Sequence, residues 1–218
     1  MQYQAVVFDM DGVIFDTERL VIEFWKEVAK KHNIPNIEHT CIQCLGTNRV
    51  RTREIFLENY GADFPYDPYR TEVTELFNTH YKGVPLPTKP GIRELLNYLQ
   101  EQDIKVGLAS STAQHLVRDE IGTAGLLPYF QTLVCGDMVE HSKPAPDIFL
   151  KACEILNADP TKSIAIEDSF NGIRSAHCAG MTPIMVPDQV QPTDEICTLA
   201  FHVMPSLLDV LNWLKTLA

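Results

Sequence analysis

The alternation of short apolar runs with helical patterns is the feature that most constrains how this chain can fold. Apolar, β-rich runs occur at residues 5–8, 105–109, 132–135, 163–166, 183–186 and 201–204. Amphipathic patterns typical of helices separate or follow the later runs, at 91–102, 147–157 and 206–217. Strands that alternate with helices predict βαβ units and a parallel sheet with helices on both faces. We therefore expect an α/β fold with a doubly wound parallel sheet.

One interval breaks this alternation. Residues 9–104 separate the first strand from the second, far more chain than a crossover helix needs. The interval holds helical patterns at roughly 17–32, 48–60 and 67–82, and it ends in a Pro-rich segment. We predict an α/β core made of 1–16 and 85–218, with 17–84 inserted as a helical module that forms a lid. The alternative, in which these helices only add hydrophobic core, is disfavoured by their position directly after the first strand.

Composition limits the possible partners. The chain has 218 residues, 45% of them hydrophobic and 22% charged, which is ordinary for a globular protein. A net charge of -11 argues against a surface for nucleic acid or anionic membranes. The N-terminus carries no secretory signal pattern, and no stretch approaches the ~20 apolar residues that span a bilayer. We expect a cytoplasmic protein with no nucleic-acid or membrane partner, and a monomer by default.

Six cysteines are spread along the chain, and we expect them to be reduced because no secretory signal is present. Cys41 and Cys44 form a C-x-x-C, which is found in redox pairs and in half of a zinc site. Neither a second cysteine pair nor a closely spaced histidine pair completes a zinc site, and no strand precedes the motif. These absences favour a structural role for the pair.

Polar side chains follow several of the predicted strands, at the point where each strand ends. The segments are Asp9-Met10-Asp11-Gly12, Ser110-Ser111-Thr112, Ser142-Lys143-Pro144 and Glu167-Asp168-Ser169. In open α/β sheets, ligands bind outside the carboxyl ends of the strands. We therefore expect acids, hydroxyls and one lysine to converge on one edge of the sheet.

Asp9 and Asp11 are the first candidates for chemistry. Two carboxylates this close repel each other and lose hydration unless a cation or a proton shares the site. A carboxylate acts as a nucleophile toward phosphorus, but both groups are anionic, and Mg²⁺ removes that obstacle. Asp9 and Asp168 are the natural ligand pair for Mg²⁺. The alternative is a turn with spare acids, which the other strand ends disfavour.

The remaining groups complete a phosphoryl-transfer site. The hydroxyl of Ser110 and the ammonium of Lys143 suit the phosphoryl oxygens and the charge of the transition state. Asp11 suits the transfer of a proton to the leaving oxygen and, later, from water. Gly12 permits backbone torsions that other residues resist and a close approach to the substrate.

These motifs together resemble those of the haloacid dehalogenase (HAD) superfamily, in the branch with β-phosphoglucomutase and many small phosphatases. The matching segments are Asp9-x-Asp11-Gly12-Val13 with Asp16-Thr17-Glu18, Ala109-Ser110-Ser111, Ser142-Lys143-Pro144-Ala145-Pro146-Asp147, and Ile166-Glu167-Asp168-Ser169-x-Asn171-Gly172. The resemblance implies a Rossmann-like core and a helical cap inserted after the first strand. The second aspartate also separates this chain from true haloacid dehalogenases and phosphonatases, so it favours phosphate esters as substrates.

The resemblance also implies roles for individual residues. Asp9 would be the nucleophile and Asp11 the acid/base. Mg²⁺ would lie on Asp9, on the backbone carbonyl of Asp11 and on Asp168, with Glu167 in support. The expected contacts to a small phosphorylated metabolite are Gly12, Thr17, Arg49, Ser110, Ser111, Lys143 and Asn171.

Substrate choice is expected to depend on the inserted module. Gly46-x-x-Arg49 resembles the cap segment with which the mutases contact the far end of their substrate, so Arg49 is a candidate for a phosphate or a sugar hydroxyl. A solvated helix face is the equally supported alternative for Arg49. For Arg51 and Arg53 we expect surface positions.

Three functions are compared. A Mg²⁺-dependent phosphatase acting on a small metabolite, above all a sugar phosphate, is favoured over a phosphosugar mutase of the β-phosphoglucomutase kind. The mutases carry a histidine four residues after the motif threonine, where this chain has Val21, and a lysine in the cap segment that 76–81 does not show. A catalytically inactive binding protein is disfavoured because Asp9, Lys143 and Asp168 are all present.

Overall fold

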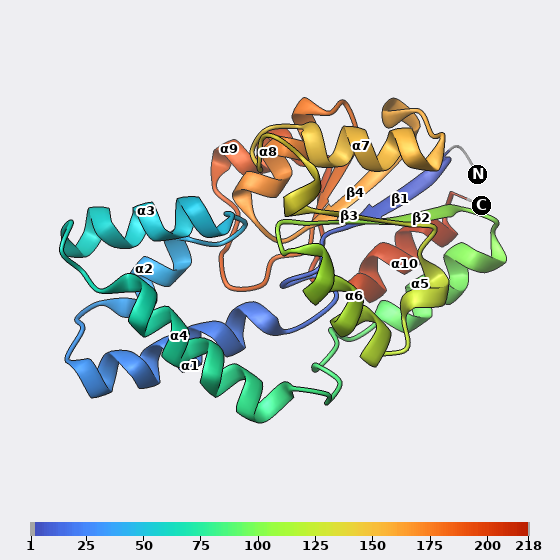
Figure 1. Cartoon of the computed structure of the whole chain (residues 1–218). Coiled ribbons are helices and arrows are strands. Elements are labelled where there is room, and N and C mark those ends of the chain that lie inside the picture. The colour runs from blue at the N-terminus through green and yellow to red at the C-terminus, as the bar shows by residue number, and fades with distance from the viewer. Residues whose placement is uncertain (1–2, 218) are drawn as a thin grey trace.

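The computed structural model describes residues 3–217 and is built around a parallel sheet (Figure 1). Its strands are β1 (Ala5–Phe8), β2 (Lys105–Ser110), β3 (Thr132–Cys135), β4 (Ser163–Glu167), β5 (Thr182–Met185) and β6 (His202–Val203). The strand order is β3-β2-β1-β4-β5-β6, and each neighbouring pair is parallel. The predicted doubly wound α/β fold is confirmed, and no strand end differs from its predicted position by more than one residue.

Helices cover both faces of the sheet. The helices α5 (Ile92–Glu101), α6 (Gln114–Thr123) and α10 (Leu207–Lys215) lie on one face, and α7 (Asp147–Leu156) and α8 (Phe170–Cys178) on the other (Figure 1). Side chains of β1 alternate between the two layers, because successive residues of a strand point to opposite faces. Val6 and Phe8 join the first hydrophobic cluster, whereas Ala5 and Val7 join the second. A central strand buried on both sides explains its uninterrupted apolar sequence.

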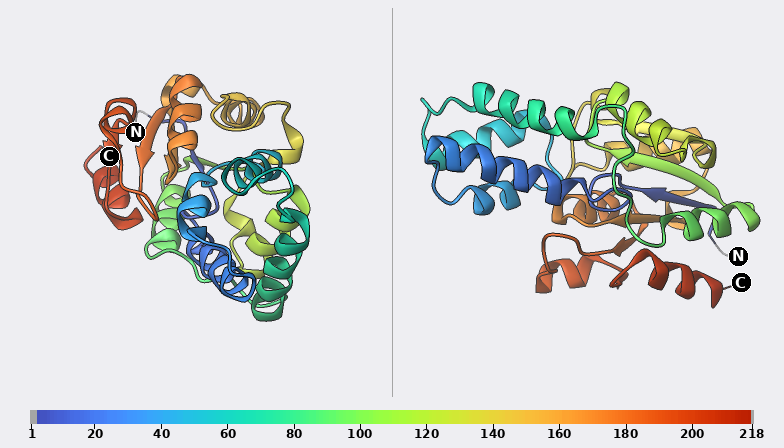
Figure 2. Two further views of the ribbon diagram at one scale, coloured as in Figure 1. Left: turned by 90° about the vertical axis from the view of Figure 1, so that its left-hand side faces the viewer. Right: turned by 90° about the horizontal axis from the view of Figure 1, so that it is seen from below.

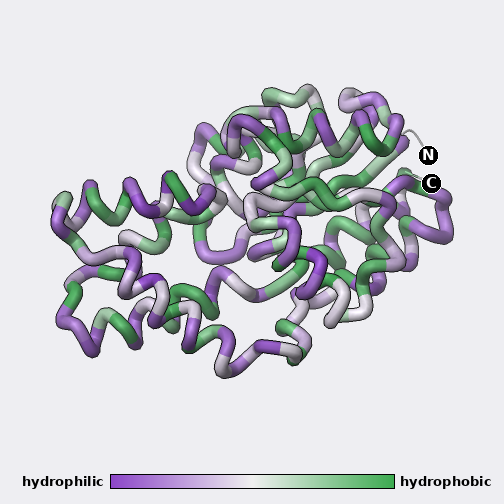
Figure 3. Tube along the Cα trace, viewed as in Figure 1, coloured by the Kyte–Doolittle hydropathy of each residue, from purple (hydrophilic) through white to green (hydrophobic). Residues whose placement is uncertain are grey.

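Helical periodicity explains how the covering helices bind the sheet. In α5, Leu95, Leu96 and Leu99 are fully buried, as expected for a stripe at i, i+1 and i+4. Burying one such leucine contributes roughly 1.5–3 kcal/mol relative to exposure. Figure 3 shows that hydrophobic and hydrophilic residues also alternate along other helices. The short helix α9 (Asp194–Leu199) contributes Ile196 to a smaller cluster beside β5.

A helical module lies between β1 and β2 in the sequence. It consists of α1 (Thr17–His32), α2 (Ile37–Gln43), α3 (Arg49–Tyr60) and α4 (Tyr66–Tyr81), and it extends beyond the carboxyl ends of the strands (Figures 1 and 2). Its own aromatic cluster includes Trp25 and Phe56, with ring centroids 4.5 Å apart. The sequence did not predict α2, because seven residues are too few for a clear helical period. The domain limits 17–84 stay a prediction.

The two chain segments that join the module to the sheet lie side by side. Phe15 and Thr88 form an antiparallel bridge, and the backbone N of Asp16 donates to the carbonyl of Pro87 at 2.9 Å. The ammonium of Lys89 donates to Asp188 Oδ1 at 2.6 Å. The entry and exit of the module are therefore held together at one place. None of the helices within 3–217 combines the length and the apolar character that a membrane crossing demands.

Candidate active site

The site begins where the central strands end. β1 is the strand from which the chain winds outward in both directions, and Asp9 follows it directly. The backbone N of Asp9 donates to the carbonyl of Ile166 at 2.9 Å, which ties the end of β1 to β4. Ser110 is the last residue of β2 and Glu167 the last of β4. The predicted residues thus meet at the reversal point of the sheet, where such folds bind ligands.

Lys143 connects the carboxylates. Its ammonium donates to Asp9 Oδ1, to Glu167 Oε1 at 2.5 Å and to the carbonyl of Ala109 at 3.0 Å. Burial alone would lower the pKa of Lys143, but the charges of Asp9 and Glu167 raise it above its usual value. The two carboxylates therefore favour the charged form of this buried lysine at the edge of the sheet.

Glu167 has a structural task as well as a charge. Its Oε2 accepts from the backbone N of Asp168 at 3.1 Å, from the backbone N of Ser169 at 3.2 Å and from the hydroxyl of Ser169 at 3.0 Å. Gly172 leaves room for it, since a Cβ there would lie 1.8 Å from the carboxyl carbon of Glu167. Glu167 thus orients Lys143 and fixes the turn from β4 into α8.

Three carboxylates make a candidate cation site. Oxygen atoms of Asp9, Glu167 and Asp168 all lie within 4.8 Å of one another, and the three residues are buried. Burial raises the pKa of Asp9 to about 8 and moves that of Asp168 well above its ordinary value. Asp168 Oδ2 is enclosed and has no hydrogen-bond partner among residues 3–217.

These residues fit a divalent cation. Carboxylate oxygens are the donors that hard cations prefer, and a bound cation relieves both the repulsion and the unpartnered oxygen. Gly12, at a φ of 82°, allows the chain to pass close by: a Cβ there would lie 2.2 Å from Asp168 Oδ2. Because Glu167 already accepts four hydrogen bonds, Asp9 and Asp168 are the better direct ligands.

Asp11 is held from two sides. The hydroxyl of Thr17, the first residue of α1, donates to Asp11 Oδ1 at 2.6 Å. The hydroxyl of Thr112, just after β2, donates to Asp11 Oδ2 at 2.9 Å. The backbone N of Thr112 donates to Ser110 Oγ at 3.1 Å, which ties this turn to the end of β2. Sequence reasoning placed Thr112 at this edge of the sheet but gave it no individual role.

A cleft separates the module from the core beside these groups. Gly46, at the turn after α2, approaches the β4–α8 turn so closely that a Cβ would lie 2.4 Å from Ser169 Oγ. The cleft measures about 510 Å³, and Lys143 is among its lining residues. Its other walls are formed by Gln43, Thr47, Asn48, Val50, Arg51, Glu54 and Ile55 of the module and by Ser142, Pro144 and Asn171 of the core. Five of these eleven residues carry an amide or a hydroxyl, three are charged and three are apolar.

The arginines at the start of α3 differ in their surroundings. Arg51 is exposed and pairs with Glu54 at 3.0 Å and Glu58 at 2.7 Å, and Arg53 pairs with Asp67 at 3.2 Å. Both therefore lie at the surface, as expected. Arg49 is also exposed, and within the described chain it has no ion-pair partner. Of the three, Arg49 is the arginine with an uncommitted charge.

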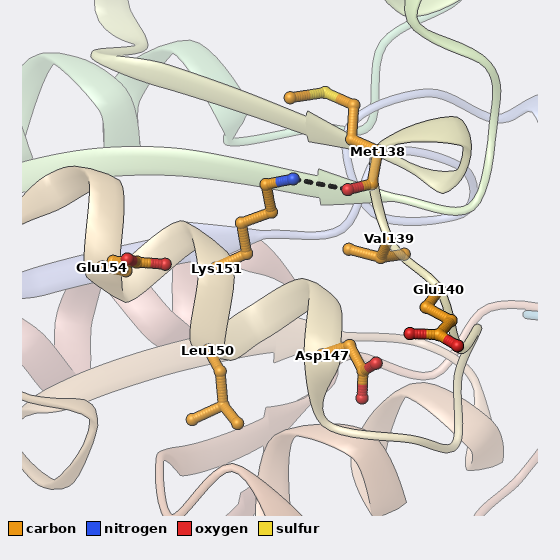
Figure 4. Close-up of a pocket in the computed structure, with 7 residues that line it drawn as sticks. All are labelled: Met138, Val139, Glu140, Asp147, Leu150, Lys151 and Glu154. Atoms are coloured by element: carbon orange, nitrogen blue, oxygen red, sulfur yellow. Dashed lines mark hydrogen bonds between the residues drawn. The ribbon is translucent and has the colours of Figure 1, made fainter.

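Other features of the sequence lie near or away from the site. Ser111 is half-buried beside Gly136, and Glu18 in the first turn of α1 has its pKa raised by burial and by Asp11 and Asp9. Burial also raises the pKa of the free thiols Cys41 and Cys44, which opposes reactivity. An open depression of about 530 Å³ beside α7 (Figure 4) is lined by none of the predicted site residues.

A doubly wound sheet with buried carboxylates and a buried lysine at its reversal point defines a hydrolase of the phosphoryl-transfer type. Residues 6–186 match the family model described as haloacid dehalogenase-like hydrolase. The chain belongs to this family, in its phosphatase and β-phosphoglucomutase branch, and is a phosphoric monoester hydrolase.

Several known proteins resemble most of the chain or nearly all of it. The phosphorylated carbohydrates phosphatase of Thermotoga maritima is 33% identical over 181 residues, which cover 83% of each chain. The beta-phosphoglucomutase of Bacillus subtilis is 34% identical over 197 residues, covering 87% of this chain and 85% of the relative. A solved Thermotoga maritima structure, provisionally named a beta-phosphoglucomutase, is 30% identical with a TM-score of 0.78, covering 99% of this chain and 100% of its own.

Proposed function

We propose that the protein is a Mg²⁺-dependent phosphatase that hydrolyses a small phosphorylated metabolite, above all a sugar phosphate, through a phospho-aspartate on Asp9. The observation that carries this proposal is the buried contact of Lys143 with Asp9 next to Asp168, whose Oδ2 lacks a partner among the described residues. A nucleophile, a fixed cation for the phosphoryl group and a cation site thus share one edge of the sheet.

The first step transfers the phosphoryl group to the protein. A carboxylate oxygen of Asp9 attacks phosphorus, and the bond between phosphorus and the ester oxygen breaks. Asp11 gives its proton to the leaving oxygen, which departs as an alcohol. Lys143 and the hydroxyl of Ser110 bind the phosphoryl oxygens and offset their charge in the transition state.

The second step releases phosphate. Asp11, now ionised, takes a proton from water as the water oxygen attacks phosphorus, and the bond from phosphorus to Asp9 breaks. Asp9 is thereby restored, and Asp11 is again protonated. Mg²⁺, held by Asp9, Asp168 and the backbone carbonyl of Asp11 with Glu167 in support, would neutralise charge between the phosphoryl group and the carboxylates.

The cleft supports a polar leaving group. Its amides and hydroxyls offer donors and acceptors to sugar hydroxyls, and the charge of Arg51 is already engaged by Glu54 and Glu58. The relative named a phosphorylated carbohydrates phosphatase agrees with this choice. The contacts we propose for the substrate are Gly12, Thr17, Arg49, Ser110, Ser111, Lys143 and Asn171.

A phosphosugar mutase is the second candidate, and the resemblance to the beta-phosphoglucomutase of Bacillus subtilis favours it. A mutase would return the phosphoryl group to a sugar hydroxyl instead of water and would need a bisphosphate primer. Valine at position 21, packed in the module cluster, supports the phosphatase, because the mutases have a histidine there.

A screen of hexose and pentose monophosphates tests the proposal. With Mg²⁺ we expect steady release of free phosphate, which stops with EDTA and returns when Mg²⁺ is restored in excess. Primer-dependent formation of an isomer without phosphate release would support the mutase instead. Activity unchanged by EDTA would overturn the metal assignment.

A further inference from the structure

We infer that Thr112 is a positioning residue for the acid/base Asp11, and that it is needed most for leaving groups that must be protonated. The inference rests on the proposed acid/base role of Asp11. Its structural basis is the hydrogen bond of 2.9 Å from the Thr112 hydroxyl to Asp11 Oδ2. Neither the motifs of the sequence nor the cation site requires a hydroxyl at this position.

The two hydroxyls on Asp11 come from different parts of the molecule. Thr17 begins α1 of the helical module, whereas Thr112 belongs to the core directly after β2. With Thr17 on Oδ1 and Thr112 on Oδ2, both carboxylate oxygens of Asp11 accept a hydrogen bond. The orientation of the carboxylate relative to the sheet is therefore set by Thr112, since any movement of the module carries Thr17 with it.

The backbone of Thr112 is itself fixed. Its N donates to Ser110 Oγ at 3.1 Å, and its carbonyl accepts from the backbone N of Gly136 at 3.1 Å. Gly136 sits so close to this turn that a Cβ would lie 2.2 Å from the carbonyl oxygen of Ser111. Thr112 thus joins Asp11 rigidly to the end of β2 that carries Ser110, the proposed phosphoryl ligand.

In the described structure, the Thr112 side chain neither caps the neighbouring helix α6 nor contributes much to the hydrophobic core. The helix α6 starts at Gln114, and its first backbone N is satisfied by Asp137 Oδ1 at 3.1 Å, not by Thr112. Thr112 is half-buried, so its methyl group adds little to the core. The contact with Asp11 is the side-chain hydrogen bond that the described structure gives this hydroxyl.

The chemistry explains which substrates depend on Thr112. As Asp11 gives its proton to the leaving oxygen, negative charge develops on the carboxylate, and a hydrogen bond to a charged acceptor strengthens. An alkoxide from a sugar phosphate is a poor leaving group and needs that proton. The p-nitrophenolate ion is stable at neutral pH and leaves without it. Loss of the Thr112 hydroxyl is therefore selective for alkyl esters.

The experiment compares kcat/KM on two substrates. One is p-nitrophenyl phosphate, and the other is the hexose monophosphate that the wild type cleaves fastest with Mg²⁺. The variants are Thr112→Val, which keeps the shape, Thr112→Ser, which keeps the hydroxyl, and Thr112→Ala. Thr198→Val, which removes an exposed threonine hydroxyl on α9, is the matched control. Because kcat/KM reports the steps up to loss of the leaving group, phosphoenzyme hydrolysis does not obscure the comparison.

For Thr112→Val and Thr112→Ala we expect kcat/KM on the hexose phosphate to fall by about 10- to 100-fold, the size of a hydrogen bond to a charged group. On p-nitrophenyl phosphate we expect a loss of less than about threefold, since protonation of that leaving group adds little. Thr112→Ser should recover most of the hexose phosphate activity, and Thr198→Val should resemble the wild type on both substrates.

Equal losses on both substrates, or no loss on either, would overturn the role of Thr112. The variant Asp11→Asn distinguishes a wrong role for Thr112 from a wrong acid/base role for Asp11. If Asp11→Asn shows the alkyl-selective loss and the Thr112 variants do not, the acid/base role stands and the inference about Thr112 is wrong. If Asp11→Asn itself shows no selectivity, the role of Asp11 falls and the inference falls with it. If Thr112→Val does not fold, Thr112→Ala and Thr112→Ser decide the outcome by the same ratio.

Discussion

The edge of the sheet and the helix α3 both concentrate charge, but they use it differently. At the sheet edge, the side chains of Lys143 and Glu167 are 1% and 0% exposed and lie 2.5 Å apart. On α3, the side chains of Arg51 and Glu58 are 46% and 59% exposed and form a pair of similar length, 2.7 Å. Burial of a charge is costly unless it is paired, whereas an exposed pair contributes about 0–1 kcal/mol. Burial, not the number of ion pairs, therefore marks the functional region.

The largest effect is expected from Asp9→Asn, which tests whether the buried charges serve catalysis. The amide cannot attack phosphorus, so activity should fall by about 10⁴-fold or more. The thermal midpoint should stay near that of the wild type, because the amide oxygen still accepts from Lys143 and a buried charge is removed. Phosphate release and a thermal melt measure the two effects. Full activity in this variant would disprove the assignment of the nucleophile.

Lys143→Met tests the pairing itself. Removing the cation leaves Asp9 and Glu167 buried without a partner charge, which should lower the free energy of unfolding by roughly 3–5 kcal/mol. Activity should fall by about 10²–10³-fold, since a donor to the phosphoryl group is lost. Urea unfolding and a phosphate assay measure these changes. Lys26→Met is the control, because Lys26 forms an exposed pair with Glu23. Similar destabilisation by both variants would contradict the comparison.

Arg49→Ala and Arg51→Ala compare two arginines on the same helix. If Arg49 contacts the substrate, its loss should raise KM for the sugar phosphate by about tenfold with kcat within about twofold. Arg51, already engaged by Glu54 and Glu58, should change KM by less than about twofold and stability by less than about 1 kcal/mol. Steady-state kinetics on both variants decides the matter. A change in KM of less than about twofold for Arg49→Ala as well would place Arg49 on the solvated helix face.

Glu120 on α6 offers a smaller test, through pH. Its Oε2 is enclosed without a partner in the described structure, and burial, then the charges of Asp11 and Asp119, raise its pKa from 4.5 to about 8. Between these values the folded protein holds a proton that the unfolded chain has lost. The contribution of Glu120 to stability therefore declines as the pH rises from 4.5 through 8.

Glu120→Gln should remove this decline. The free energy of unfolding of the variant, compared with that of the wild type, should therefore be higher at pH 8 than at pH 5. Because Glu120 is half-buried and solvent screens part of the effect, the difference should be about 1 kcal/mol or less. Urea unfolding at several pH values measures it, and Glu154→Gln, which changes an exposed glutamate on α7, is the control. Parallel pH profiles for the wild type and Glu120→Gln would rule out this titration.

Much of the fold could be predicted because the relevant signals are local. The apolar run Ala5-Val6-Val7-Phe8 predicts the strand β1, and the spacing of the leucines predicts the helix α5. Convergence of Asp9, Ser110, Lys143 and Glu167 also followed, since the carboxyl ends of parallel strands share one edge. The helix α2 was not predicted because its seven residues are too few to show a helical period.

The partners within the site could not be predicted in the same way. Thr112 and Asp11 are 101 residues apart in the sequence. No sequence pattern predicts which group accepts the hydrogen bond of a threonine that follows a strand. Glu167 was expected to support a metal, yet its hydrogen bonds to Lys143 and to the β4–α8 turn appear only once both segments are folded. The sequence likewise did not show which arginines of α3 form ion pairs. Those pairs depend on where Glu54, Glu58 and Asp67 lie in the folded chain.

The sequence by itself determined the alternation of strands and helices, the insertion after β1 and the groups that end each strand. These follow from periodicity and residue type, which act over a few neighbouring residues. The tertiary structure alone decided that an oxygen of Asp168 has no partner among residues 3–217, that Lys143 bridges Asp9 and Glu167, and that Thr17 and Thr112 hold Asp11 from two sides. Hydrogen bonds and burial between distant segments depend on distances that exist only in the folded chain. Those contacts give Asp9 and Asp11 the partners that make them a candidate active site.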